Sequence, residues 1–214
     1  MKLGQSVAEI DIEARRLRVA DGPTIRFAHL DGADGVNSIV ARTIFGRSSN
    51  PRTIGFGLEV EIPRELLSQR DNSVDIYFAI TQWGYGWVFP KMKTFTIGVG
   101  GIHESNTSMK ACLERFLTRY GLTLDALRVK GQYIPFGDFR RRPGRTCHPL
   151  CGDAGGFVDP VTGEGISYAM QSGRAAAHAI LDARTAGKPD IALDKYIQRI
   201  SPIMSSLRMA NRWK

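Results

Sequence analysis

The sequence has 214 residues, 43% hydrophobic and 23% charged, so it is long enough and apolar enough to bury a sizeable core. Its 29 Lys and Arg exceed its 21 Asp and Glu, and the formal charge of +8 favours anionic partners without naming one. Three cysteines are too few for a disulfide framework, and no run of about 18 uncharged apolar residues is present. We therefore expect a cytoplasmic protein without a spanning helix, and peripheral contact with a membrane surface stays open.

The first 50 residues predict a hairpin, a glycine turn and a helix. Apolar and charged residues alternate over 7–19, a turn follows at 20–23, and 24–30 has the pattern of a second strand. After the glycine turn, apolar residues at helical spacing run up to Gly46, a typical helix stop.

The middle of the chain has the pattern of an antiparallel sheet. Extended runs are expected at 54–62, 74–81, 85–90 and 95–99, followed by a helix at 109–120 and a strand at 127–135. A helix is expected at 166–183 and a last one from about Leu193. The fold class is α/β (α+β): a partial FAD-binding Rossmann-like domain from residues 1–50 and 143–185, an inserted antiparallel-sheet substrate domain over 51–142, and a C-terminal helix within 186–214.

The most informative segment is Gly152–Gly165, which runs straight into a helix. Asp153 follows a strand, where α/β folds place ligand-contacting side chains, and its carboxylate suits a ligand hydroxyl. The small residues 154–156 would let the backbone approach a flat ligand closely. Gly163 and Gly165 open the helix, whose positive end favours negative charge on a ligand.

This segment resembles the second flavin-binding segment of the geranylgeranyl reductase family, within the larger group of flavoprotein hydroxylases. The resemblance implies FAD as the cofactor and a hydrogen bond from a ribityl hydroxyl to Asp153. It also implies that Gly152 belongs to the site and that Pro160 and the Gly163-Glu164-Gly165 turn lie beside the isoalloxazine ring. From the residues alone, we expect Glu164 to help start the helix rather than to donate a proton.

A second segment, 32–38, is similar to the family's A-D-G-x-N-S turn between a strand and a helix. The resemblance implies that Asp34 and Gly35 lie near the FAD pyrophosphate. By itself, a short Asp-Gly turn is typical of ordinary helix capping.

A third segment, Tyr85-Gly86-Trp87-Val88-Phe89-Pro90, is followed after seven residues by Gly98-Val99-Gly100. Alternation along a strand places Tyr85, Trp87 and Phe89 on one face, as a substrate wall or as part of the core. The spacing looks like the Y-x-W-x-F-P-x7-G-x-G pattern of geranylgeranyl reductases. This resemblance implies that the segment, including Pro90, Gly98 and Gly100, lines a pocket for an isoprenoid chain, and we favour the substrate wall.

The family's opening G-x-G-x-x-G turn and the acidic residue that follows it do not occur in these 214 residues. We therefore expect a truncated copy or fragment that holds FAD poorly. The function expected from the resemblance is FAD-dependent reduction of isoprenoid double bonds, with reduced nicotinamide or ferredoxin as electron donor. The alternatives are an FAD-dependent aromatic monooxygenase and a non-catalytic fragment unable to hold FAD.

No catalytic residue is assigned, because the four histidines lack a partner at a recognisable triad spacing. Cys147, His148 and Cys151 have no second ligand pair that would close a metal site, so no metal is expected. No nucleic-acid-binding module is recognisable, and the oligomeric state is not predicted.

Overall fold

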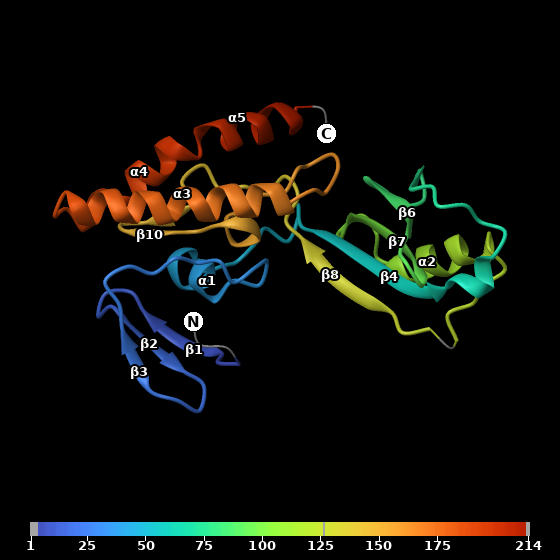
Figure 1. Ribbon diagram of the computed structural model, residues 1–214, viewed down its shortest axis with the longest axis horizontal. Helices are drawn as coiled ribbons and strands as arrows, with labels where there is room; N and C mark the ends of the chain where they lie inside the picture. The colour runs from blue at the N-terminus through green and yellow to red at the C-terminus, as the bar shows by residue number, and fades with distance from the viewer. Residues whose placement is uncertain (1–3, 126, 213–214) are drawn as a thin grey trace. The chain divides into compact units, whose positions relative to one another are not determined.

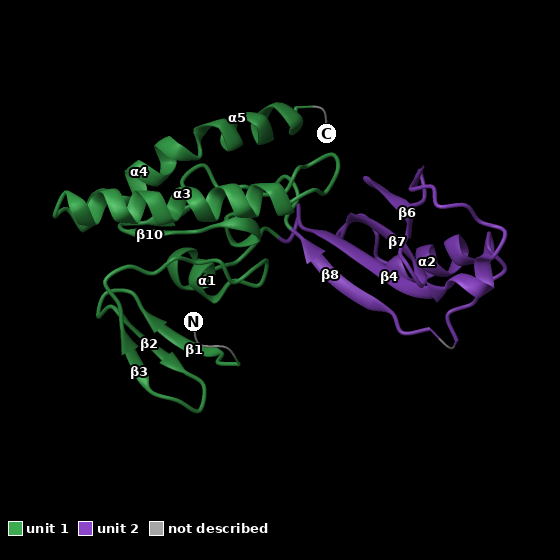
Figure 2. Ribbon diagram, viewed as in Figure 1, with its two compact units in different colours: residues 1–50, 135–214 green, residues 51–134 purple. Residues whose placement is uncertain are grey.

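The structure is a computed structural model that describes residues 4–125 and 127–212. The chain forms two compact units (Figure 2): unit 1 contains residues 1–50 and 135–214, and unit 2 contains residues 51–134. The mixed α and β class with antiparallel sheets, predicted from the sequence, is confirmed.

The elements are labelled in chain order in Figure 1. The strands are β1 (Val7–Asp11), β2 (Arg16–Val19), β3 (Thr24–Arg26), β4 (Gly55–Pro63), β5 (Asp75–Phe78), β6 (Gly84–Pro90), β7 (Thr94–Ile102), β8 (Lys130–Ile134), β9 (Gly144–Arg145) and β10 (His148–Pro149). The α-helices are α1 (Ile39–Phe45), α2 (Met109–Thr118), α3 (Ile166–Thr185), α4 (Ala192–Arg199) and α5 (Ser201–Ala210). Short 3₁₀ helices are η1 (Arg64–Leu67), η2 (Gly152–Gly155) and η3 (Pro189–Ile191).

Unit 1 begins with an antiparallel sheet in the order β1-β2-β3. The expected single strand over 7–19 is wrong, because the chain turns between β1 and β2. The Asp11 carboxylate accepts the Ala14 N–H (2.7 Å), and Arg15 has a left-handed φ of 51°. The strand expected at 24–30 is also too long, since β3 ends at Arg26.

Helix α1 follows the glycine turn as expected and ends at Gly46, whose φ of 75° suits glycine. Its buried side chains pack with Ile10, Leu150 and Ala154 in one small core. Parallel pairing in the described part of unit 1 consists of isolated bridges, one of which joins Gly32 to Leu150. A Cβ at Gly32 would lie 2.5 Å from the Leu150 side chain, so this close approach requires glycine.

Helices α4 and α5 lie along α3 and bury the second core of unit 1 (Figure 1). Ala176 and Ala179 of α3 pack against Leu193, Tyr196 and other apolar residues of α4 and α5. The single C-terminal helix expected from the sequence is thus two helices. They meet at Ile200, and Pro202 lies in the first turn of α5, where its missing N–H costs no helix bond.

Unit 2 is a five-stranded antiparallel sheet in the order β5-β6-β7-β4-β8. Helix α2 covers one face of the sheet and buries the largest apolar cluster of the unit, which includes Val60, Val88 and Ile97 of the sheet and Leu113 and Phe116 of the helix. We call the opposite face of the sheet the open face.

The chain returns to unit 1 at Pro135, earlier than the expected position 143. Two contacts within unit 1 account for this. Phe136 forms a β-bridge with Val158, and the Asp138 carboxylate accepts the Asn50 N–H (2.6 Å).

Candidate functional site

Asp153 lies in η2, between the β10 segment and the loop that leads to α3. The short helix is anchored to α3, because the Gly152 N–H donates to the buried Ser172 hydroxyl (3.0 Å). Gly152 has a φ of 53°, and a Cβ there would lie 3.1 Å from Ala169 of α3. Glycine at 152 therefore lets the aspartate sit close to the start of α3.

The Asp153 carboxylate is half-buried and receives no hydrogen bond from any residue that the structure describes. Burial raises the pKa of this carboxyl, because no neighbouring donor offsets the loss of water. Its Oδ1 lies 3.5 Å from the position that a Cβ at Gly165 would occupy. Asp153 and Gly165, the N-cap residue of α3, are thus close together, and an acceptor-only carboxylate without a partner fits a ligand hydroxyl.

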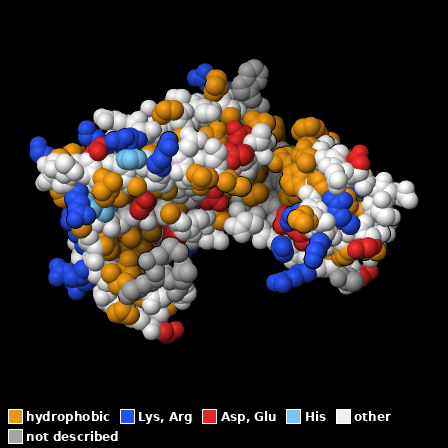
Figure 3. Space-filling view, viewed as in Figure 1, with side chains coloured by type: hydrophobic (Ala, Val, Ile, Leu, Met, Phe, Trp, Pro, Cys, Tyr) orange, Lys and Arg blue, Asp and Glu red, His pale blue; other side chains and the backbone are white. Residues whose placement is uncertain are grey.

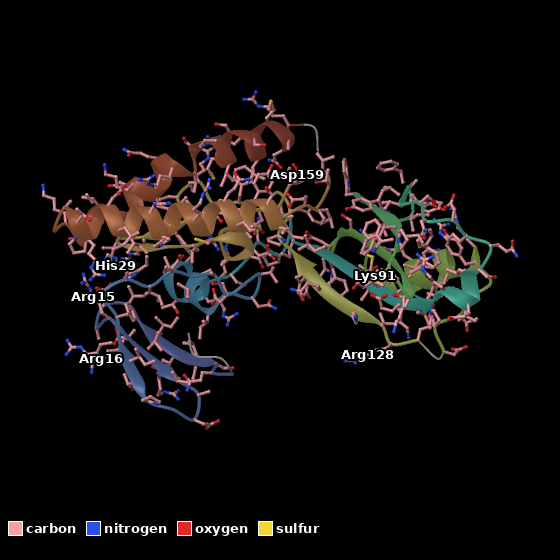
Figure 4. The ribbon with its side chains drawn as sticks, in the orientation of Figure 1. Arg15, Arg16, His29, Lys91, Arg128 and Asp159 are labelled. Carbon is pink, nitrogen blue, oxygen red and sulfur yellow. The ribbon has the colours of Figure 1, made fainter. Side chains whose placement is uncertain are left out.

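The loop before α3 is held by its own side chains. Asp159, labelled in Figure 4, accepts the N–H groups of Val161 (2.9 Å) and Thr162 (2.8 Å). Gly163 follows with a φ of 74°, and the buried Pro160 completes the turn. The expected helix-start role of Glu164 is confirmed, because its carboxylate accepts the Ser167 N–H (2.7 Å). The chain itself therefore pairs one backbone N–H at the start of α3. This lowers the number of unpaired N–H groups that a ligand anion could use.

The small residues at 154–156 do not line an open surface. A Cβ at Gly156 would lie 2.3 Å from the Asp138 carbonyl oxygen, and one at Gly155 would lie 2.9 Å from that of Leu150. The expectation that these residues let a flat ligand approach is wrong, because the protein's own backbone occupies that space. Gly155 and Gly156 serve close packing instead.

Asp34 caps helix α1 with both of its carboxylate oxygens. They accept the Ser38 hydroxyl (2.6 Å), the Ile39 N–H (2.7 Å) and the Val40 N–H (3.3 Å). Gly35 has a φ of 77°, with open space where a Cβ would be. The capping accounts for the aspartate in this turn, so the predicted role of Asp34 and Gly35 near a pyrophosphate stays a prediction.

Tyr85, Trp87 and Phe89 lie on the open face of unit 2 and outside its core, which takes Val88 from the other face of β6. The Trp87 ring is 5.9 Å from that of Tyr85 and 6.1 Å from that of Phe89, between centroids. We call these three residues the aromatic strip. Figure 3 shows hydrophobic side chains gathered on the surface of unit 2. An aromatic strip outside the core is available to an apolar ligand.

The Trp87 indole lies flat across β7 and reaches β4. A Cβ at Gly98 would overlap it at 2.2 Å, one at Gly100 would touch it at 3.2 Å, and one at Gly57 would lie at 3.5 Å. Gly98 and Gly100, predicted to contact substrate, are thus buried beneath the indole. Their absent side chains determine where Trp87 lies.

The indole also forms one wall of a groove on the open face, with a volume of about 410 Å³. The rest of the groove is formed by β4 and β8, with Gly57, Glu59, Lys130, Gly131, Gln132 and Ile134 as lining residues. The sequence alone does not indicate this side of the site. Alternation along β8 shows which of its residues share a face. It does not show that Glu59 pairs with both Lys130 of β8 and Gly98 of β7, and only this pairing places that face beside Trp87.

His148 and Cys151 form hydrogen bonds within unit 1. The Leu30 N–H donates to the His148 Nδ1 (3.2 Å), and the Cys151 thiol donates to the Asp31 carboxylate (3.1 Å). Among residues 4–125 and 127–212, no three His, Cys, Asp or Glu side chains gather as metal ligands would. No helix in the described part of the chain has the length and apolarity needed to cross a bilayer.

Three relatives show what the chain is similar to. A geranylgeranyl diphosphate reductase of Rhodobacter capsulatus is 32% identical over 184 residues, which cover 83% of this chain and 46% of the relative. An uncharacterized protein of Methanosarcina barkeri is 32% identical over 212 residues, or 97% of this chain and 53% of the relative. A menaquinone reductase of Mycobacterium tuberculosis is 27% identical over 217 residues, or 92% and 52%. No family model matches the sequence.

Solved structures share the fold. A geranylgeranyl bacteriochlorophyll reductase-like protein from Thermoplasma acidophilum has a TM-score of 0.73 at 22% identity, over 98% of this chain and 56% of that chain. PqsL of Pseudomonas aeruginosa, a probable FAD-dependent monooxygenase, has a TM-score of 0.62 at 19% identity, over 98% and 61%.

The fold is therefore that of FAD-dependent oxidoreductases. Within this class, the chain belongs to the geranylgeranyl reductase family, as its sequence resemblance indicates. It spans about half the length, or less, of the curated relatives that it matches.

Proposed function

We propose that this chain supplies flavin-binding and substrate-binding residues of an FAD-dependent oxidoreductase that reduces isoprenoid double bonds. The names of the relatives support this proposal, since geranylgeranyl diphosphate and menaquinone both carry isoprenoid chains. Reduced nicotinamide or ferredoxin is the proposed source of electrons.

The flavin would be held in unit 1 by Asp153 and the start of α3. Asp153 has a carboxylate without a partner in the described residues, which suits a ribityl hydroxyl. Gly165 lets the start of α3 come close to that carboxylate, since a Cβ there would lie 2.9 Å from the Val158 side chain and 3.5 Å from Asp153 Oδ1. When bound, FAD would supply the hydride that reduces a carbon–carbon double bond, and a proton completes the addition.

The isoprenoid would lie on the open face of unit 2. The single observation that carries the proposal is that the aromatic strip lies outside the core, with Trp87 laid flat on glycines. A flat indole offers an apolar surface to an alkene chain at little cost in side-chain entropy, because Gly98 and its neighbours already fix its position. The strip would bind and orient the chain and exclude water from it.

The test measures geranylgeranyl diphosphate binding to the full chain by isothermal titration calorimetry. Trp87→Ala should weaken binding at least tenfold, because it removes the largest apolar contact. Trp83→Ala is the matched control: Trp83 is an exposed tryptophan of the same unit outside the strip. Equal affinities for the parent and Trp87→Ala, with both variants folded, would overturn the substrate assignment.

The monooxygenase alternative shares the fold, so the fold does not separate the two activities. The chemistry does. Oxygen consumption coupled to substrate turnover would indicate a monooxygenase, whereas anaerobic gain of two hydrogens by the isoprenoid would indicate a reductase.

A further inference from the structure

The aromatic strip ends abruptly in a charged cluster. Alternate positions along β6 are Tyr85, Trp87 and Phe89, and the next position in this series is Lys91. Its ammonium group lies 2.5 Å from the Glu61 carboxylate of β4. Lys91, labelled in Figure 4, belongs to unit 2. A lysine at this position stops the apolar surface.

Glu61 is held by three donors. Besides Lys91, it accepts the hydroxyls of Thr94 (2.8 Å) and Thr96 (3.0 Å), both of β7. Burial raises the pKa of the Glu61 carboxyl, but the hydrogen bonds and the charge of Lys91 outweigh it, so the pKa lies below its ordinary value. We call Glu61, Lys91, Thr94 and Thr96 the polar clamp. Near neutral pH it is an ionised, hydrogen-bonded group.

The strand register places the polar clamp at the far end of the open face. Phe89 pairs with Thr96, which pairs with Glu61, so the clamp directly borders the strip. The chain enters unit 2 shortly before Gly55 and leaves it just after Ile134. These two residues pair with each other at the end of the sheet opposite the polar clamp. The strip therefore runs from the end where the chain enters and leaves unit 2 to a charged end.

We infer that the polar clamp marks the end of the isoprenoid-binding surface and limits the length of isoprenoid chain that the open face accepts. This inference rests on the proposed function. The strip from Tyr85 to Phe89 covers four residue steps, about 13 Å at roughly 3.3 Å per residue. A chain that extends further would cover Glu61 and Lys91 and remove water from both ions, which costs more than apolar contact returns.

The experiment compares geranyl, farnesyl, geranylgeranyl and geranylfarnesyl diphosphates by isothermal titration calorimetry on the full chain. Parent affinity should rise with each isoprene unit and then level off. In Glu61→Leu with Lys91→Met, the affinity should keep rising for at least one further unit, by about tenfold for that unit. Glu65→Leu with Lys93→Met is the matched control, because it makes the same changes at two exposed residues next to the clamp.

A levelling point that does not move would overturn the inference, and so would an equal loss of affinity at every chain length, which would show that the clamp binds the head group. If no prenyl diphosphate binds to the parent, the proposed function fails first. If the double variant does not fold, Glu61→Gln with Lys91→Met keeps an acceptor oxygen for one threonine hydroxyl and an NH2 that can donate to the other, and it should shift the levelling point in the same direction.

Discussion

Trp87 owes its position to residues that have no side chain. Its backbone pairs with Gly98, and the indole turns toward β7 and crosses Gly98 and Gly100 as far as Gly57 on β4. With alanine at 98, the Cβ and the ring would overlap, and the ring would have to leave the face. The glycines thus give the open face a flat surface that tryptophan alone would not provide.

Two alanine substitutions under the same ring should therefore differ. Gly98→Ala would place a Cβ 2.2 Å from the indole, so we expect displacement of Trp87 and at least a tenfold loss of prenyl diphosphate affinity. Gly57→Ala would make an ordinary contact at 3.5 Å and should leave the indole in place, so its affinity should stay above that of Gly98→Ala. Calorimetry and tryptophan emission report both effects. Similar behaviour of the two variants would contradict the described packing.

The sequence could predict which aromatic residues share a face, because strand alternation alone determines it. It could not predict that Gly98 and Gly100 lie under the indole. The direction in which a tryptophan folds over its sheet depends on cross-strand neighbours, and these depend on register. Glu59 and Lys130 were missed for the same reason, since pairing of β4 with both β7 and β8 brings them beside Trp87.

Among the elements, β10 is joined to the segment after β3 by the Gly32 N–H, which donates to the Pro149 carbonyl (2.9 Å), and by the buried side chain of His148. The His148 Nδ1 accepts the Leu30 N–H (3.2 Å), and its ring meets Phe27 edge to face. Burial lowers the pKa of His148, and the charge of Arg15 adds to this effect. Protonation would put a proton on the nitrogen that accepts the hydrogen bond, so this junction requires the neutral imidazole.

The folded protein should therefore lose stability in mild acid. Because the pKa of His148 is lower in the folded than in the unfolded state, the stabilisation is present above the ordinary histidine pKa and is lost as the pH falls through the folded value. Urea unfolding at neutral and mildly acidic pH measures the difference. His148→Phe should show a smaller drop than the parent, and His178→Phe, at an exposed position on α3, should behave like the parent. Equal drops in all three proteins would exclude His148 as the cause.

Helices with a clear apolar periodicity, or with a residue that marks their end, could be predicted from the sequence. Gly46 ends α1 in the left-handed conformation expected of glycine, and α3 follows its apolar stripe. The turn between β1 and β2 was missed because charged residues continue the alternation through it, and an Asp11 hydrogen bond makes the turn. The break between α4 and α5 was missed because Pro202 lies where a helix tolerates proline.

At the scale of the whole molecule, the flavin contacts assigned to this chain concern one half of the cofactor. Asp153 and the start of α3 would meet the ribityl chain and the ring, whereas Asp34 is occupied by the capping of α1. The 214 residues contain no G-x-G-x-x-G turn for a pyrophosphate. We therefore expect riboflavin and FAD to bind the full chain with affinities within about tenfold of each other, with the ADP part adding little.

A titration followed by flavin fluorescence tests whether Asp153 belongs to a flavin site. Riboflavin is titrated against the parent, Asp153→Asn and the control Asp125→Asn, whose exposed aspartate lies in unit 2. We expect saturable binding to the parent and to Asp125→Asn. Loss of a charge-assisted hydrogen bond of about 1.5 to 3 kcal/mol should weaken binding to Asp153→Asn by roughly ten- to a hundredfold. Equal affinity for all three proteins, or no saturable binding to the parent, would show that Asp153 is not part of a flavin site.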